Sequence, residues 1–81
     1  MPDPLETVTG LLRDLFDEYE GPVTRDLTAR KVPQWDSLGH VQLMVLIEQT
    51  FGIRFSADEV GKFRDVGDLV DAIDTKVAAK R

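Results

Sequence analysis

The spacing of apolar residues along this chain predicts several helices and almost no β-strands. Between residues 4 and 20, apolar side chains recur every three or four positions, which is the spacing of one face of an amphipathic helix. These positions are Leu5, Val8, Leu11, Leu12, Leu15, Phe16 and Tyr19. A last stretch after Asp65 has the same spacing, at Val66, Leu69, Val70, Ile73 and Val77. Residues 38–51 are denser in apolar side chains than one helix face requires, so some of them must face outward or toward a partner.

Residues that favour helix ends mark the boundaries of these stretches. Gly21-Pro22 is a helix-ending pair, so the first helix is expected over residues 4–20. Asp36 is a favoured N-cap, which makes Ser37 the first residue of the second helix. Gly52 suits a left-handed cap at the far end of that helix.

The remaining segments predict a long loop and one short helix. Residues 23–34 have mixed polarity and are expected to form a loop that Val23, Leu27 and Val32 anchor to the core. Ser56 and Glu59 have the spacing of a capping box, which opens a brief third helix to about residue 63. The expected fold is therefore all-α, a four-helix bundle with three longer helices, a short third helix and a long first loop. We expect it to form a single domain over residues 1–81.

The composition narrows the possible classes of function. The 81 residues include fifteen acidic and ten basic side chains, a formal net charge of −5, so the chain as a whole repels nucleic acid and favours basic proteins. No cysteine is present, which excludes disulfides and thiolate metal sites, so any thiol that the protein uses comes from outside. The longest apolar run is far shorter than a membrane span, so we expect no membrane insertion, and a cytoplasmic location.

Ser37 has two possible roles at the start of its helix. Backbone N–H groups point outward there and favour an anion, so a phosphoester on the Ser37 hydroxyl would lie in a favourable position. Serine is also a routine residue at helix starts, where it needs no further role. Spacing alone leaves both interpretations open, and the second is the more common case.

The segments around Ser37 resemble the acyl and peptidyl carrier protein family. These segments are Asp36-Ser37-Leu38, Val41-Gln42-Leu43, Glu48 and Phe51-Gly52-Ile53. With the order and lengths of the helices, the resemblance covers roughly residues 5–77. It implies that a phosphopantetheinyl transferase attaches 4′-phosphopantetheine from coenzyme A to Ser37, with magnesium. It also implies that Asp36 helps the transferase engage Ser37, in addition to capping the helix.

A carrier rather than an enzyme is what this resemblance implies. The thiol of the attached arm would hold an acyl or aminoacyl group as a thioester, between a loading enzyme and a downstream synthase or transferase. The second helix would contact those partners, with Leu38, Val41, Met44 and Glu48 as candidate docking residues. Met44 equally suits the core, and an exposed Glu48 could be solvated only.

Catalysis by the chain itself is disfavoured. Asp36, Ser37 and His40 could be combined into a hydrolase triad, but Asp36 has no evident way to orient His40. The sequence indicates no oxyanion hole or substrate pocket. We expect His40 to pack against Trp35 across the start of the helix, or to touch a partner.

The second helix departs from the pattern of fatty-acid carriers, which often have several acidic residues there. Glu48 is its one acidic residue, and the acidic side chains gather instead near the end of the first helix. This acidic group is Asp14, Asp17, Glu18 and Glu20. We therefore expect a stand-alone, monomeric carrier of a specialised pathway, such as polyketide or nonribosomal peptide synthesis. The alternative is an unmodified helical adaptor with a carrier-like fold, and covalent modification separates the two.

Overall fold

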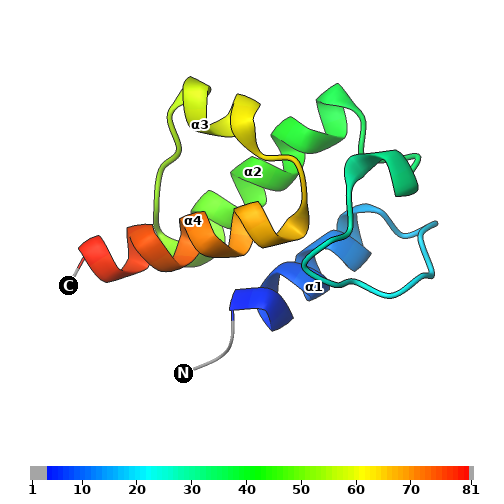
Figure 1. The fold of residues 1–81 in the computed structure, drawn as a ribbon, viewed down its shortest axis with the longest axis horizontal. Helices are drawn as coiled ribbons and strands as arrows, with labels where there is room; N and C mark the ends of the chain where they lie inside the picture. Colours follow the sequence, from blue (N-terminus) through cyan, green and yellow to red (C-terminus); the bar gives the residue numbers. More distant parts are fainter. Residues whose placement is uncertain (1–3, 81) are drawn as a thin grey trace.

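The computed structural model describes residues 4–80 as a bundle of four α-helices (Figure 1). In chain order the elements are α1 (Pro4–Leu15), the 3₁₀-helix η1 (Ala29–Lys31), α2 (Ser37–Phe51), α3 (Ala57–Lys62) and α4 (Val66–Ala79). Within the described residues the β-type pairing is one isolated bridge between Thr28 and Asp65. The predicted all-α fold with a short third helix is confirmed. No helix in residues 4–80 has the length and apolar character needed to cross a bilayer.

The three longer helices build the core, and α3 lies over it. Helix α1 packs against both α2 and α4. The buried apolar side chains are Val8, Leu12, Phe16, Leu27, Val32, Trp35, Leu43, Met44, Ile47, Ile53, Val66, Leu69, Val70 and Ile73. None of them lies in α3, which contributes only the half-buried Val60 to this cluster. Since each fully buried aliphatic side chain stabilises a fold by roughly 1.5 to 3 kcal/mol, α3 is the least firmly held helix.

Helix α1 ends earlier than the apolar pattern predicts. The expected helix over residues 4–20 was wrong beyond Leu15, where the chain turns although Phe16 stays buried. The side chain of Gln34 holds this turn: its Oε1 accepts from the Glu18 N–H at 2.9 Å, and its Nε2 donates to Asp17 Oδ1 at 3.3 Å. The end of α1 therefore depends on a residue of the distant loop.

The long loop is anchored at both of its buried positions. Leu27 and Val32 are in the core as predicted, and the half-buried Val23 packs against it. The loop also supplies acceptors to the start of α4, because Val66 N–H donates to Leu27 O at 3.0 Å and Gly67 N–H donates to the Arg25 carbonyl at 2.7 Å. Loop residues thus satisfy backbone donors that a helix start leaves unpaired.

Helix α3 begins with the predicted capping box. Ser56 Oγ accepts from the Glu59 N–H at 3.2 Å, and Glu59 Oε1 accepts from the Ser56 N–H at 2.9 Å. Glu59 also pairs with Lys76 of α4 at 2.9 Å. One side chain therefore both starts α3 and ties it to α4.

The cap at the end of α2 generates the first prediction. Gly52 has φ 65°, in the left-handed region, and its N–H donates to the Glu48 carbonyl. We expect Gly52→Ala to lower the free energy of unfolding by about 1 to 2 kcal/mol, because a Cβ is strained there. Gly10→Ala is the matched control: it lies inside α1 with open space around its Cβ position, so it should raise stability by about 0.5 to 1 kcal/mol. Urea unfolding of both variants measures this, and equal effects would contradict it.

The second prediction concerns the pH dependence of α3. Hydrogen bonds from the Ser56 N–H and from Lys76 hold the pKa of Glu59 below its usual value. Its contribution to folding is therefore present above the unfolded-state pKa and is lost as the pH falls through the lowered folded-state pKa. The α3 Cα chemical shifts should accordingly move toward random-coil values in acid. Glu59→Gln, which keeps the cap but not the charge, should remove most of this acid dependence, and an unchanged acid transition would refute the assignment.

Candidate functional site

Ser37 is the first residue of α2, and its neighbour Asp36 caps the helix. Asp36 has extended backbone angles, and its Oδ1 accepts from the Gly39 N–H at 2.8 Å. The Asp36 carbonyl accepts from the His40 N–H at 2.8 Å, so the first turn is closed by side chain and backbone together. The cap predicted for Asp36 is confirmed. A carboxylate is also favoured at this positive end of the helix dipole.

The hydroxyl of Ser37 is accessible. Ser37 is exposed, and within residues 4–80 its hydroxyl makes no hydrogen bond. The backbone N–H groups of Ser37 and Leu38 likewise have no acceptor in this part of the chain. These donors point out from the start of α2 beside the hydroxyl. The arrangement suits a phosphoester on the Ser37 oxygen, because the added negative charge would meet two free amides.

The ring of His40 bridges the start of α2 to α3. Trp35 Nε1–H donates to His40 Nδ1 at 2.9 Å, so Nδ1 is an unprotonated acceptor. His40 Nε2 lies 2.9 Å from the Val60 carbonyl oxygen and must donate its proton there. His40 is thus the neutral Nε2–H tautomer, and it stacks on the buried Trp35 ring at 6.2 Å between centroids. The expected packing of His40 against Trp35 is confirmed, with a hydrogen bond added.

This bridge argues against the hydrolase triad. Both ring nitrogens of His40 are occupied, by Trp35 and by Val60, so neither accepts the Ser37 proton. The Asp36 carboxylate accepts from the Gly39 N–H rather than orienting the imidazole. A general base must lie within hydrogen-bond reach of the proton it removes, and His40 here has no free acceptor.

A shallow crevice of about 390 Å³ opens beside Ser37, between the start of α2 and α3. Its lining residues are Ala29, Trp35, Asp36, Ser37, His40, Val60, Gly61 and Phe63. Most of these surfaces are apolar or aromatic, with the cap carboxylate at one side. The crevice lies directly beside the Ser37 side chain.

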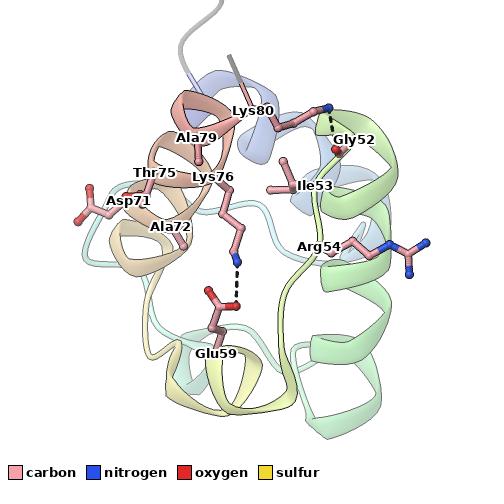
Figure 2. A pocket seen from close by; sticks show the side chains of 10 residues that line it. All are labelled: Gly52, Ile53, Arg54, Glu59, Asp71, Ala72, Thr75, Lys76, Ala79 and Lys80. Carbon is pink, nitrogen blue, oxygen red and sulfur yellow. Dashed lines mark hydrogen bonds and ion pairs between the residues drawn. The ribbon is translucent and has the colours of Figure 1, made fainter.

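A larger cavity, of about 620 Å³, lies at the opposite end of α2 (Figure 2). It is bounded by Ile53 and by α4, with the Lys76–Glu59 ion pair at one end and a 2.8 Å hydrogen bond from Lys80 to the Gly52 carbonyl at the other. With a rise of about 1.5 Å per residue, Gly52 lies roughly 20 Å along α2 from Ser37. The cavity shares no lining residue with the crevice beside Ser37, although it reaches Glu59 of α3, the neighbour of Val60 in that crevice.

The four candidate docking residues are placed in different environments. Leu38 and Val41 are 67% and 52% exposed. Met44 is only 3% exposed, so the alternative that it completes the core is correct and its assignment to a docking surface is not supported. The Glu48 carboxylate is half-buried, and its Oε2 accepts from the Phe55 N–H at 2.8 Å. Glu48 therefore holds the link after α2, instead of being free for a basic partner.

Sequence reasoning gave no structural role to two residues near this site. Val45 is 43% exposed and extends the surface of Leu38 and Val41 by one further turn. Gly39 is buried where a Cβ would lie 2.3 Å from the Gln34 carbonyl oxygen and 2.9 Å from Phe16 Cε1. Glycine there lets α2 begin directly against the loop and the end of α1. The available signal was a glycine in the first turn of a helix, where propensity alone disfavours it.

Comparison with known proteins assigns the family. Residues 35–73 match the family described as "Phosphopantetheine attachment site". The acyl carrier protein of Acidothermus cellulolyticus is 38% identical over 72 residues, which cover 84% of this chain and 84% of that protein. The acyl carrier protein of Thermosynechococcus vestitus is 31% identical over 75 residues, 93% of each chain.

Solved structures agree with that assignment. The solution structure of holo acyl carrier protein from Geobacter metallireducens superposes with a TM-score of 0.86 at 39% identity, covering 99% of this chain and 91% of that chain. An acyl carrier protein from Thermotoga maritima, at 21% identity and a TM-score of 0.82, shares the fold. The bundle and its exposed helix-start serine define a phosphopantetheine-dependent carrier, not an enzyme. The chain belongs to the acyl carrier protein family.

The cap of α2 generates the third prediction. We expect Asp36→Ala to lower the free energy of unfolding by about 1 kcal/mol, because the Gly39 N–H loses its acceptor. Asp36→Asn should retain most of the stability, since asparagine caps about as well as aspartate. Urea unfolding of the two variants tests this, and a fully stable Asp36→Ala protein would show that the cap contributes nothing.

Proposed function

We propose that this chain carries acyl or aminoacyl intermediates as thioesters on a 4′-phosphopantetheine arm attached to Ser37. The observation that supports this most directly is the exposed, unpaired Ser37 hydroxyl at the start of α2, within the matched residues 35–73. The chain has only one other serine, Ser56, whose hydroxyl is engaged in the α3 capping box. Ser37 is therefore the serine available for modification.

The proposed modification uses coenzyme A as donor and a phosphopantetheinyl transferase with magnesium as catalyst. The Ser37 oxygen forms a new bond to the phosphorus that bears the pantetheine, the bond from that phosphorus to the adenosine nucleotide breaks, and the serine proton passes to the transferase. The two free N–H groups of Ser37 and Leu38 favour the resulting phosphodiester anion. Asp36 is proposed to help the transferase engage Ser37. Asp36→Asn keeps the helix cap but removes the carboxylate, so this variant separates the two roles of Asp36.

Once attached, the arm supplies the thiol that a cysteine-free chain lacks. The residues of the chain provide a fixed anchor: α2 is capped at Asp36, and His40 joins it to α3 next to the attachment point. Tethering gives each partner enzyme a high effective concentration of the cargo. The chain itself positions the arm and presents the cargo to the partner enzymes. Among the described residues, none near Ser37 is arranged to catalyse a reaction.

We further propose a specialised biosynthetic pathway, polyketide, nonribosomal peptide or a related one, in the cytoplasm. The supporting observation is the shortage of free carboxylates on α2, where Glu48 is the one acidic residue and is engaged by the Phe55 N–H. Leu38 and Val41 are the proposed docking residues for the loading enzyme and the downstream synthase. The chain is proposed to act as a monomeric single domain over residues 1–81.

The fourth prediction tests the attachment site. Intact-mass analysis after incubation with coenzyme A, magnesium and a broad-specificity phosphopantetheinyl transferase should show a gain of one phosphopantetheinyl group in the parent chain and none in Ser37→Ala. Because Lys31, Arg54 and Lys62 are tryptic sites, the two serines fall in separate peptides, 32–54 and 55–62. The added mass should lie in peptide 32–54.

The controls make a negative result informative. Helical circular dichroism and a cooperative urea transition must show that Ser37→Ala is folded. A folded parent chain that several transferases leave unmodified, and that carries no such group as purified, would favour the unmodified adaptor instead. A group found on Ser56 would refute the assignment to Ser37.

A further inference from the structure

His40 lies at the outer end of the side of α2 that packs into the core. Positions 37, 40, 44 and 47 follow one another at helical spacings of three and four, so they lie along one side of α2. Ser37 is exposed and His40 is half-buried, whereas Met44 and Ile47 are 3% and 0% exposed. An alkyl chain that extended from Ser37 into the bundle along this side would therefore meet His40 before it reached the core.

The His40 side chain leaves no opening between α2 and α3 at this point. Its Nε2 lies 2.9 Å from the Val60 carbonyl oxygen, and both residues line the crevice beside Ser37. A methylene group needs about 3.5 to 4.0 Å to each neighbouring atom, so one that passed between them would require a separation of about 7 to 8 Å. The hydrogen bond must therefore break, and α3 must move roughly 4 Å from α2, before a chain can enter there.

Trp35 holds the imidazole in this closed position from its other edge. Trp35 is 4% exposed, its Nε1–H donates to His40 Nδ1 at 2.9 Å, and the two rings stack. The Trp35 ring also stacks on the buried Phe16 at 6.0 Å between centroids, so the core fixes Trp35 itself. Turning the imidazole away would leave a buried Trp35 donor without an acceptor, which is unfavourable. The closed position therefore follows from the packing of the bundle.

Few other contacts hold α3 against α2. The helix has no fully buried side chain, and its Glu59–Lys76 ion pair is made to α4. Between residues 4 and 80, the hydrogen bond of His40 with Val60 is the one that joins α2 directly to α3. Loss of this bond would therefore loosen the cleft next to Ser37, while the packing of α1, α2 and α4 on one another remains.

We infer that His40 closes the cleft between α2 and α3 to cargo, so that an acyl chain carried on Ser37 stays at the surface of the bundle. This inference rests on the proposed carrier function and adds the class of cargo that suits it. Because a chain at the surface keeps its methylene groups in water, the carrier gains no stabilisation from a long alkyl chain. The site therefore favours short or polar acyl and aminoacyl groups, and His40 is the residue that sets this preference.

The fifth prediction uses two cargoes that differ only in length. A phosphopantetheinyl transferase loads the chain from acetyl-coenzyme A or from octanoyl-coenzyme A, and intact mass confirms each product. The two loaded forms of the parent chain should have the same methyl chemical shifts at Met44 and Ile47, because neither cargo reaches the core. Hydroxylamine should cleave the two thioesters at rates within about twofold of each other, since both are exposed to solvent.

Variants of His40 separate the bond to Val60 from the bond to Trp35. In His40→Gln, the side-chain amide nitrogen can take the place of Nε2 and donate to the Val60 carbonyl, so the cleft should stay closed. In His40→Asn, the side-chain oxygen can take the place of Nδ1 and accept from Trp35, but the side chain is too short to reach Val60. His40→Asn should therefore admit the octanoyl chain, with shifts at Met44 and Ile47 and cleavage about fivefold slower than for acetyl.

Lys76→Gln is the matched control for a general loosening of α3. It weakens the ion pair with Glu59, which holds α3 to α4, and leaves the bond between His40 and Val60 in place. Both cargoes should stay exposed in this variant. Helical circular dichroism and a cooperative urea transition must show that each variant is folded. His40→Ala removes both bonds of the imidazole and replaces His40→Asn if that variant does not fold.

The inference is wrong if octanoyl already shifts the methyl signals of Met44 and Ile47 in the parent chain. It is also wrong if folded His40→Asn leaves the octanoyl thioester as exposed as the acetyl thioester, or if Lys76→Gln shelters it equally. Intact mass keeps this test separate from the carrier function. Complete loading of Ser37 together with one of these results removes the role of His40 alone, whereas absent loading removes the carrier function itself.

Discussion

The two hydrogen bonds of the His40 ring connect the elements that surround Ser37 at the start of α2. Trp35 ends the long loop, His40 lies in the first turn of α2, and Val60 lies in α3, so one imidazole connects three elements. Helix α3 has no fully buried side chain; it is also held by the half-buried Val60, by the Glu59–Lys76 pair and by the edge-on contact of Phe55 with Phe63, which flank it. The hydrogen bonds of His40 with Trp35 and with the Val60 carbonyl therefore help to position α3 next to Ser37.

Close packing around Gly39 gives this end of the bundle its shape. The glycine leaves room for the Gln34 carbonyl and the Phe16 ring, and Gln34 in turn binds the residues that follow α1. The start of α2, the end of the loop and the end of α1 consequently form one packed unit. Ser37 projects from that unit, so a group attached there would be anchored to closely packed residues and could extend into solvent.

The two sides of α2 differ in what they contact. Toward α3 lie the His40 bridge and the crevice beside Ser37. Toward α1 lies a shallow depression lined by Leu15, Val41, Gln42, Val45 and Leu46. Of the acidic group near the end of the first helix, Asp14 lies on α1, and Asp17, Glu18 and Glu20 follow it.

Features that depend on near neighbours in the chain could be predicted from the amino-acid sequence. The Asp36 cap, the Ser56–Glu59 capping box, the left-handed Gly52 and the start of α2 at Ser37 all follow from side chains a few positions apart, so local spacing predicted them. Contacts between distant parts of the chain set where α1 ends, which face of α2 is buried and what Glu48 binds. The end of α1 depends on Gln34, far along the chain. With apolar residues around so much of α2, the pattern could not distinguish Met44, in the core, from Val45, at the surface; that was settled by which helices pack on which side.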